Sequence, residues 1–350
     1  MWGGVNMYQQ LNNKMGGGTG RKSNFELLRI ASMFLVVLTH YVPTRDGVSA
    51  DTFLQSTAAT LCTLELHSLS IVCTHCFVLI SGYFGIRLSW KSFANLLYQM
   101  LFWSGASVLT AAAIGLPVSV GLFLKGIVWG WFPWAYIILM ILSPMINAFI
   151  EKCGMHGLGR YIIVFYLLST IGGYLMGCRD FFSGMSGLSL VGLYLIGAYL
   201  RRCEFKPFQH TSKVNFAIYL ILGLALLVVN VLLLLTGINS SPYGYLNPVV
   251  IVMAIYLFLT FTRMDIGSRS LINGVAASAF SVYLFHCHPA IGGWISQGWT
   301  RINEACGPYL AIPVAVVSFI AIFAFCCAVD RLRIYSFKII SNKVFNNGKG

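Results

Sequence analysis

Residues 214–236, VNFAIYLILGLALLVVNVLLLLT, contain no charged side chain. A helix needs about 20 mostly apolar residues to cross the hydrocarbon core of a bilayer, and this run is long enough. Of the 350 residues of the chain, 57% are hydrophobic and only 9% are charged, against about 25% charged residues in an ordinary soluble domain. With a mean hydropathy of +0.77, the chain is predicted to be an all-α, polytopic membrane protein. This composition excludes a disordered chain, a nucleic-acid-binding domain and an ordinary cytosolic enzyme.

Apolar runs of about this length occur ten times along the chain, and each predicts one transmembrane helix. They cover residues 25–43, 66–85, 93–115, 132–150, 161–178, 185–200, 214–236, 246–262, 272–294 and 309–329. The stretch 116–131 is also apolar and rich in tryptophan, which indicates a re-entrant or interfacial segment. We expect residues 1–20 to form a flexible N-terminal tail, residues 21–335 the transmembrane domain and residues 336–350 a C-terminal tail.

The distribution of positive charge supports this count of spans. Most of the 23 lysines and arginines fall in segments that lie on one side of the membrane if both termini are cytoplasmic. The opposite side receives Arg45, Lys125, Arg179 and Arg301. Positive residues are enriched in cytoplasmic loops, so both termini are predicted to be cytoplasmic. The net charge of +13 is then a property of these loops rather than a sign of a nucleic-acid partner.

The ten cysteines do not predict a disulfide framework, because most sit in or beside apolar runs, where cysteine acts as a small hydrophobic residue. These are Cys73, Cys76, Cys178, Cys287, Cys326 and Cys327. The CxxC spacing of Cys73 and Cys76 lies inside a predicted span without a second matching pair of ligands. We therefore expect no metal site in this protein.

The first predicted span carries two polar side chains that a membrane disfavours, Arg29 and His40. They are eleven positions apart, so they lie on nearly the same helix face and about 16 Å apart along its axis. A guanidinium binds phosphate or carboxylate, and an imidazole is suited to general-base catalysis near neutral pH. We therefore expect the two groups at opposite ends of one tunnel. The alternative is that both side chains reach toward the headgroups on their own side of the membrane.

Further histidines occur in pairs on other predicted spans. His67 and His75 share a face of the second span, whereas His286 and His288 on the ninth span point apart, so at most one of them faces a given cavity. A metal site built from His40, His75 and His286 is an alternative that the spacing does not require. The simpler interpretation of each histidine is a hydrogen-bonded packing residue.

Other candidates for binding the substrates lie near the predicted cytoplasmic side or near span ends. Arg87 and Lys91 follow the second span and suit an anionic cofactor, although they also suit plain positive-inside anchors. Glu65 and Tyr83, together with His75 and His286, complete the candidate binding residues.

The residues around Arg29 and His40 resemble a known family. The segment FELLRIASMFLVVLTHY (25–41) is similar to the start of the membrane-bound acyltransferase-3 family, which includes bacterial O-acetyltransferases that modify cell-surface polysaccharides. Four further segments resemble family motifs in the same order: CFVLISGYFGIR (76–87), WFPWAYIILMILSPMI (131–146), VGLYLIGAYLRR (191–202) and SAFSVYLFHCHP (278–289). The similarity covers about residues 21–340, and ten spans is the number found in the family.

The resemblance implies an acyl-CoA-dependent O-acyltransferase of a bacterial inner membrane. The donor would be acyl-CoA, usually acetyl-CoA, used from the cytoplasmic side, and the acceptor a hydroxyl of an envelope glycan or lipid-linked sugar. By the same resemblance His40 acts as general base or transient acyl carrier, Arg29 assists donor binding, and His286 matches the late histidine of the family. The chain lacks the Arg-x-x-Arg pair of many members, having Arg87 and Lys91 instead. Membrane lipids are expected partners, nucleic acids are not, and a homo-oligomer is compatible with the sequence.

Two other function classes fit the ten spans. A transporter or flippase would move a glycan or a small solute, but a proton-coupled pump usually needs a relay of carboxylates. Glu26 and Glu65 are the only candidates for such a relay in the predicted spans, and both lie near span ends. A purely structural membrane subunit is the third class, and it does not account for Arg29 and His40.

Overall fold

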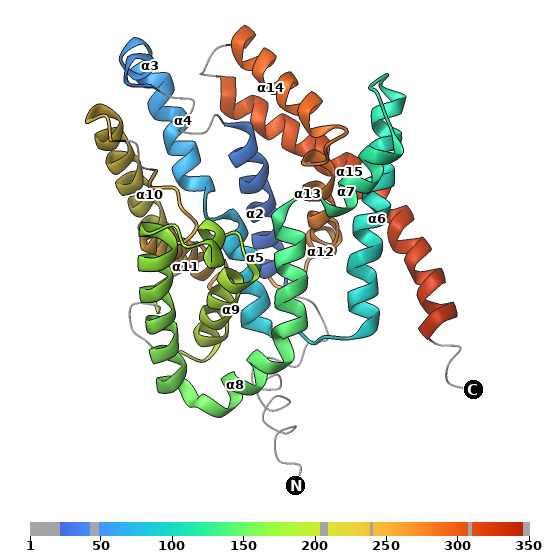
Figure 1. Ribbon diagram of the computed structural model, residues 1–350, viewed down its shortest axis with the longest axis horizontal. Coiled ribbons are helices and arrows are strands. Elements are labelled where there is room, and N and C mark those ends of the chain that lie inside the picture. Colours follow the sequence, from blue (N-terminus) through green and yellow to red (C-terminus); the bar gives the residue numbers. More distant parts are fainter. Residues whose placement is uncertain (1–21, 43–48, 204–208, 239–240, 307–309, 346–350) are drawn as a thin grey trace.

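A computed structural model describes residues 22–42, 49–203, 209–238, 241–306 and 310–345 (Figure 1). The tail predicted for residues 1–20 lies outside these ranges. Within them the regular structure consists of helices, without a β-strand. The all-α prediction is therefore confirmed for the described part of the chain.

The helices follow one another closely along the chain. In order they are α2 (Ser23–Tyr41), α3 (Ala50–Gln55), α4 (Thr57–Ser70), α5 (Cys73–Phe84), α6 (Trp90–Ala113), α7 (Val120–Val128), α8 (Trp131–Leu168), the π-helix η2 (Ser169–Leu175), the 3₁₀ segment η3 (Arg179–Gly184), α9 (Gly187–Arg202), α10 (Ser212–Leu235), α11 (Pro248–Thr262), α12 (Ser270–Ala276), α13 (Ala279–His286), α14 (Gly292–Cys306) and α15 (Ala311–Phe345). Several of them start at a polar residue whose side chain accepts a hydrogen bond from a backbone N–H of the first turn, as at Ser89, Ser119, Ser186, Thr211 and Asn247.

The ten apolar runs are mainly helical where the structure describes them, but the helices divide the runs differently. Run 66–85 is shared by α4 and α5, and run 272–294 by α12, α13 and the start of α14. Runs 132–150 and 161–178 join into one long element, α8 with η2, which bends at Gly154 (φ 63°). Run 309–329 continues as α15 to Phe345, well into the segment 336–350. Among the residues that the structure describes, five helical stretches are long and apolar enough to cross a membrane.

The segment 116–131 contains α7, which is too short to cross a bilayer. Its nine residues correspond to about 14 Å of helix, roughly half the thickness of the hydrocarbon core. None of its residues is buried. A re-entrant or interfacial position for this stretch stays a prediction, with which the short length of α7 agrees.

Helix α2 lies in the middle of the bundle, with α4, α10 and α11 on one side and α6 and α15 on the other (Figure 1). Beside it, α5 and α9 pack backbone to backbone. A Cβ atom on Gly82 would lie 2.1 Å from the carbonyl oxygen of Tyr194, and one on Gly197 would lie 2.4 Å from that of Leu79. Small residues permit this close approach, which is typical of helix pairs in membranes.

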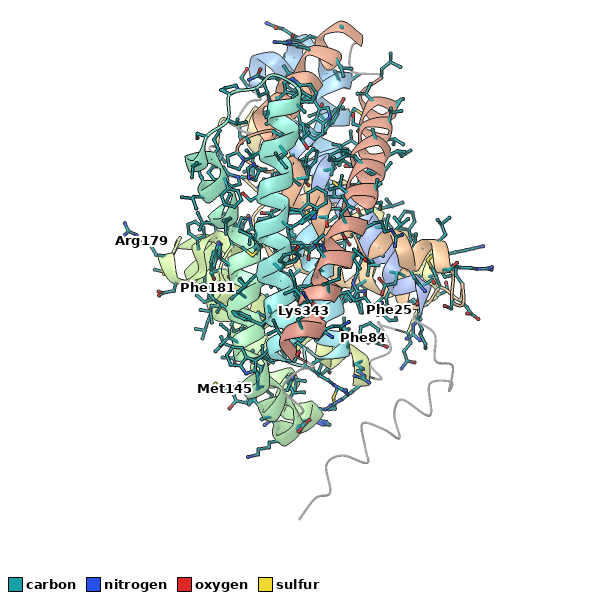
Figure 2. The ribbon with its side chains drawn as sticks, turned by 90° about the vertical axis from the view of Figure 1, so that its right-hand side faces the viewer. Phe25, Phe84, Met145, Arg179, Phe181 and Lys343 are labelled. Carbon is teal, nitrogen blue, oxygen red and sulfur yellow. The ribbon has the colours of Figure 1, made fainter. Side chains whose placement is uncertain are left out.

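The outer surface of the bundle is apolar, as expected of helices in lipid. Large hydrophobic side chains such as Leu109, Ile163, Ile221 and Val317 are more than 60% exposed. Figure 2 shows the side chains that project from the outer helix faces, among them Met145 on α8 and Arg179 at the start of η3. An apolar surface of this extent is stable in a bilayer and not in water.

A buried ion pair joins three helices and adds Asp330 to Glu26 and Glu65, the only carboxylates expected as relay candidates, because the helical stretch Pro313–Val344 extends the tenth predicted span past it. Asp330 on α15 is fully buried and pairs with Arg333, whose Nε lies 2.6 Å from Oδ1. The same carboxylate accepts hydrogen bonds from Trp103 of α6 and from Ser278 and Ser281 at the start of α13. Asp330 directly follows the predicted end of the tenth span, so the sequence pattern placed it outside the membrane.

Segments that were assigned to one side of the membrane contact one another. The backbone N–H of Ser23 donates to Gly267, and the Ser23 hydroxyl accepts from the N–H of Arg269 at 2.6 Å. Asn147 donates to the carbonyl of Ile86, which lies between the second and third predicted spans. The ring of Phe25 on α2 also contacts that of Phe84 at the end of α5. The start of α2, the α5–α6 connection and the α11–α12 connection therefore lie at the same end of the bundle.

Candidate active site

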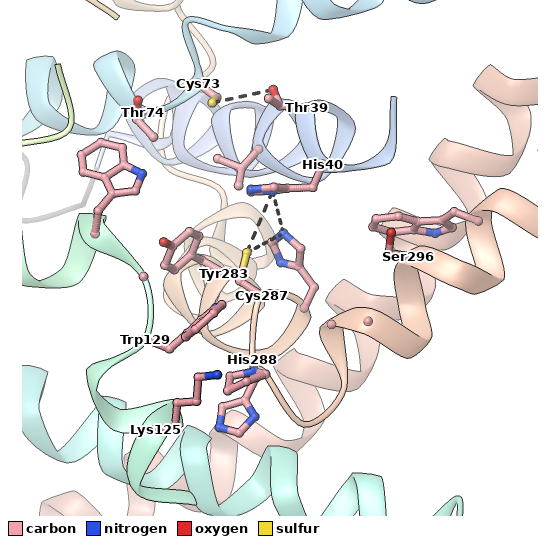
Figure 3. A pocket seen from close by; sticks show the side chains of 18 of the residues that line it. Thr39, His40, Cys73, Thr74, Lys125, Trp129, Tyr283, Cys287, His288 and Ser296 are labelled. Carbon is pink, nitrogen blue, oxygen red and sulfur yellow. Dashed lines mark hydrogen bonds between the residues drawn. The ribbon is translucent and has the colours of Figure 1, made fainter. Parts of the chain in front are cut away.

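His40 opens into a cavity of about 720 Å³, here called the histidine cavity. Its walls come from α2, α5, α7, the start of α8, and the α13–α14 region (Figure 3). Polar and ionisable lining residues are Thr39, His40, Cys73, Thr74, Lys125, Tyr245, Tyr283, His286, Cys287, His288 and Ser296. The cavity is large enough for a small organic substrate, and it combines apolar walls with a few polar groups, as binding sites usually do.

Three reactive side chains meet in this cavity: His40 from the end of α2, and His286 and Cys287 from the end of α13 (Figure 3). Nδ1 of His40 lies 3.2 Å from Nε2 of His286. Sγ of Cys287 lies 3.3 Å from the same Nε2 and 3.9 Å from Nδ1 of His40. His40 is exposed to the cavity, whereas His286 is buried.

The hydrogen bonds define the proton positions on both imidazoles. Nδ1 of His286 lies 2.6 Å from the carbonyl oxygen of Val282, which can only accept, so this nitrogen carries a proton. Nε2 of a neutral His286 is then an acceptor, and Nδ1 of His40 donates to it. Nε2 of His40 is left as an unprotonated base.

His286 and His288 both line the histidine cavity, so the expectation that at most one of them faces a given cavity is wrong. His288 lies beyond the last residue of α13, where helical geometry no longer turns the two side chains apart. Its Nδ1 accepts the backbone N–H of Ala290, so its Nε2 carries the proton and donates to Ser104, whose hydroxyl donates to the carbonyl of Phe123. His288 therefore ties the α13–α14 turn to α6 and α7. The fit is tight, because a Cβ atom on Gly126 would lie 1.7 Å from Nε2 of His288.

A second cavity of about 260 Å³, here called the arginine cavity, lies at the other end of α2. Glu26, Arg29, Ser81, Gln99 and Tyr136 are among its lining residues. Nη1 of Arg29 lies 2.5 Å from Oε1 of Glu26, and the Arg29 side chain keeps 30% of its surface exposed. The guanidinium is therefore partly neutralised and partly free to meet an anion.

Aromatic rings separate the two cavities. Phe132 and Phe280 line the arginine cavity, and Tyr283 lines the histidine cavity. The ring of Phe132 contacts those of Phe280 and Tyr283 at centroid distances of 6.4 and 6.2 Å, and Phe280 stacks on Tyr283 at 6.0 Å. We call these three rings the aromatic partition. Arg29 and His40 thus lie at the two ends of α2, as expected, but they open into two cavities rather than into one tunnel.

The comparison with protein families agrees with this site. A family model described as an acyltransferase domain, Acyl_transf_3, matches residues 22–331 and so includes both cavities. The chain belongs to the acyltransferase-3 family. It is accordingly a membrane acyltransferase, which confirms the resemblance found in the sequence. No curated protein and no solved structure was found to match the chain.

The candidate residues of this acyltransferase divide into three groups. His40 and His286 meet in the histidine cavity, and Arg29 lies in the arginine cavity. His75 is buried behind the wall, where its Nε2 donates to the carbonyl of Tyr245 at 2.8 Å. The remaining candidates line neither of these two cavities: Arg87 and Lys91 are exposed beyond the end of α5, Tyr83 packs on Phe25 and Phe258, and Glu65 is half-buried on α4.

The acyltransferase site also contains residues that sequence reasoning missed. Cys287 was interpreted as a small hydrophobic residue, and Lys125 as a loop charge. Lys125 reaches the cavity from α7, where its ammonium lies 4.8 Å from the ring of Trp129. The only signal for Cys287 in the sequence is its position beside His286.

The cluster is also the place where the described residues could hold a metal ion. The ligand atoms of His40, His286 and Cys287 lie within 4.8 Å of one another. Imidazole and thiolate are the ligands that zinc prefers in proteins. The three atoms are equally placed for hydrogen bonding and for proton transfer.

Proposed function

We propose that this acyltransferase uses acyl-CoA from the cytoplasm and transfers the acyl group, acetyl by default, to a hydroxyl of an envelope or exported glycan. The observation that carries the proposal is the unprotonated Nε2 of His40 in a cavity large enough for a sugar. A base placed there takes the proton of an attacking hydroxyl, which is the difficult step of O-acyl transfer. Because the proposed acceptors belong to the cell envelope, we propose that the protein resides in the bacterial inner membrane.

His40 takes one of two roles in this proposal, general base or transient acyl carrier. As a base, His40 removes the acceptor proton while His286 holds the ring through Nδ1 and stabilises its orientation. As a carrier, Nε2 of His40 attacks the acyl-CoA carbonyl itself. Both roles require Nε2 to be unprotonated.

The proposal places the donor on the side of the arginine cavity. Arg29 offers a partly free guanidinium there, and guanidinium pairs with phosphate or carboxylate groups. The loops that gather at this end include the exposed Arg87, Lys91, Arg263 and Arg269, which would attract the nucleotide part of CoA. We propose this end as the cytoplasmic one, with ten spans and both termini on that side. The thioester then reaches His40 when the aromatic partition moves.

The acceptor would enter the histidine cavity from the opposite side. Trp129, Trp131 and Trp299 line that cavity and supply flat apolar surfaces with polar N–H edges. Such surfaces suit the apolar faces and hydroxyl rims of a sugar ring. The binding energy gained away from the reacting hydroxyl would position it at His40.

The test is acyl transfer by the purified protein in lipid nanodiscs, followed as free CoA thiol released from acetyl-CoA in the presence of an envelope glycan fraction. Replacing His40 by alanine removes the base, so we expect the rate to fall by at least about 100-fold. His156→Ala is the matched control, because His156 is exposed on α8 outside both cavities. We propose that no metal takes part, so dialysis against a chelator should leave the rate unchanged.

A His40→Ala protein with the wild-type rate would exclude His40 as the reactive group. Wild-type protein that moves an unmodified glycan across vesicles, without consuming acyl-CoA, would favour a transporter instead. Mass spectrometry of envelope glycans with and without the gene would identify the acyl mass that is lost.

A further inference from the structure

The thiol of Cys287 stands in the arrangement of an activated nucleophile. Its sulfur lies 3.3 Å from Nε2 of His286, and Nδ1 of that ring donates to the Val282 carbonyl at 2.6 Å. Nucleophile, base and orienting acceptor therefore follow one another in a line, which is the geometry that defines catalytic triads on unrelated folds. Because the Val282 carbonyl keeps the proton on Nδ1, Nε2 carries a lone pair, which accepts from His40 at rest and takes the proton of the thiol in its place when the sulfur attacks.

The other cysteine of the cavity lacks this arrangement. Sγ of Cys73 lies 4.0 Å from the hydroxyl of Thr39 on α2. By contrast, Cys287 contacts two imidazoles at once, and it follows the last residue of α13, where the chain turns into the cavity wall (Figure 3).

We propose that Cys287 carries the acyl group as a thioester between donor and acceptor, with His286 as its base and His40 as the base of the second half-reaction. This inference rests on the proposed acyl-CoA chemistry and assigns the carrier to Cys287 instead of His40. The ligand class at this site is an acyl thioester.

The first half-reaction exchanges one thioester for another. Nε2 of His286 takes the thiol proton as Sγ of Cys287 attacks the carbonyl carbon of acyl-CoA. A new C–S bond to Cys287 forms, the C–S bond to CoA breaks, and the CoA thiolate takes the proton back from His286. The same kind of bond is made and broken, so the step needs no oxidant, metal or further reactant.

The second half-reaction returns the thiol. Nε2 of His40 takes the proton of the acceptor hydroxyl, whose oxygen attacks the carbonyl carbon held on Cys287. The C–S bond breaks, and Nδ1 of His40, 3.9 Å from Sγ, delivers a proton to the sulfur. The products are the O-acylated acceptor and a free Cys287.

The aromatic partition provides a reason for a carrier. The donor would approach from the arginine cavity and the acceptor from the histidine cavity, and the rings of Phe132, Phe280 and Tyr283 lie between the two. A covalent acyl-enzyme lets CoA withdraw and the partition close before the acceptor reacts. Water is then excluded from the donor side, and the kinetics become ping-pong.

The experiment is acyl-enzyme trapping with radiolabelled acetyl-CoA in nanodiscs without acceptor. We expect label on the wild-type protein that neutral hydroxylamine releases and that peptide mass spectrometry places on Cys287. Cys287→Ala should lose the label and at least about 100-fold of the transfer rate, whereas the matched control Cys62→Ala, half-buried on α4, should keep both.

The His40→Gln variant separates the two half-reactions. It should keep or accumulate the label on Cys287 while transfer to the acceptor is lost, because only the second base is missing. Label that persists in Cys287→Ala, or a Cys287→Ala protein with the wild-type transfer rate, would overturn the proposal. Either result leaves the proposed acyltransfer intact, whereas wild-type protein that neither takes label nor releases CoA contradicts both.

Discussion

At the scale of single residues, the two ends of α2 have different chemical surroundings. His40 is held by hydrogen bonds to uncharged groups and keeps one nitrogen free. Arg29 shares its charge with Glu26, three residues earlier on the same helix. The first arrangement suits proton transfer, and the second suits reversible binding of an anion that competes with Glu26.

Replacement of Arg29 tests this division of roles. Arg29→Ala should raise the KM for acyl-CoA by about 10-fold or more, since a hydrogen bond to a charged group contributes about 1.5–3 kcal/mol, and should change kcat much less. Arg29→Lys keeps the positive charge but loses the forked, bidentate donor geometry of the guanidinium, so an intermediate KM for acyl-CoA is expected. Initial rates at varied acyl-CoA concentration give both constants.

Lys91→Ala is the comparison for Arg29→Ala, because Lys91 is exposed and lines neither cavity. If Lys91→Ala raises KM as much as Arg29→Ala does, the donor is bound mainly by the α5–α6 connection. A drop in kcat at unchanged KM for Arg29→Ala would assign Arg29 to the chemical step instead.

At the scale of helices, the buried Asp330 carboxylate holds α6, α13 and α15 together. Its oxygens accept five hydrogen bonds, from Trp103, Ser278, Ser281 and twice from Arg333. Because α13 ends at His286, the position of the reactive cluster depends on this anchor. The network is fully satisfied, which distinguishes it from the carboxylate relay of a proton-coupled transporter.

Asp330→Asn should destabilise the protein strongly. It leaves the guanidinium of Arg333, which is only 5% exposed, without its counter-ion, and breaking a buried pair in this way costs about 3–5 kcal/mol. Thermal unfolding in detergent would show a lower Tm. The exposed Asp265 provides the control, since Asp265→Asn should leave the Tm unchanged.

The double variant Asp330→Asn with Arg333→Gln should recover part of the lost stability, because the unpaired charge is removed as well. Equal Tm values for Asp330→Asn and wild type would show that the buried pair contributes nothing to the anchoring of α13.

At the scale of the whole molecule, the fold forms two cavities, one on either side of the aromatic partition. The histidine cavity gathers Lys125 and the tryptophans, and the arginine cavity faces the end where the basic connections meet. The proposed topology requires these ends to face opposite sides of the membrane.

Labelling of single-cysteine variants tests that topology. Cys178 is exposed just before η3, on the side proposed as outer, and Cys203 follows α9 on the side proposed as cytoplasmic. A membrane-impermeant maleimide should label Cys178 but not Cys203 in intact cells, and the reverse in inverted vesicles. A permeant maleimide labels both and serves as the control. Labelling of both sites from one side would contradict the span between them.

The sequence alone determined the all-α fold class, the mainly helical state of the apolar runs and the two ends of α2, but not how the helices divide those runs. Hydropathy and helical periodicity are local properties, so residues 22–42 suffice to place Arg29 and His40 on one helix eleven positions apart. Local periodicity wrongly predicted that His286 and His288 would not share a cavity, because α13 ends at His286 and the chain then turns. Within the shared cavity the first histidine contacts His40 and the second contacts Ser104.

Only the tertiary structure decided what these residues meet. His40 and His286 are 246 positions apart, and the packing of α13 on α2 brings their rings into contact. Cys287 contacts two imidazoles, one of them 247 positions away in the chain, and Phe132, from a third helix, lies between the cavities of Arg29 and His40. The physical reason is that a lipid-exposed helix and a cavity-lining helix have nearly the same composition, so the faces that meet are fixed by packing and not by local sequence.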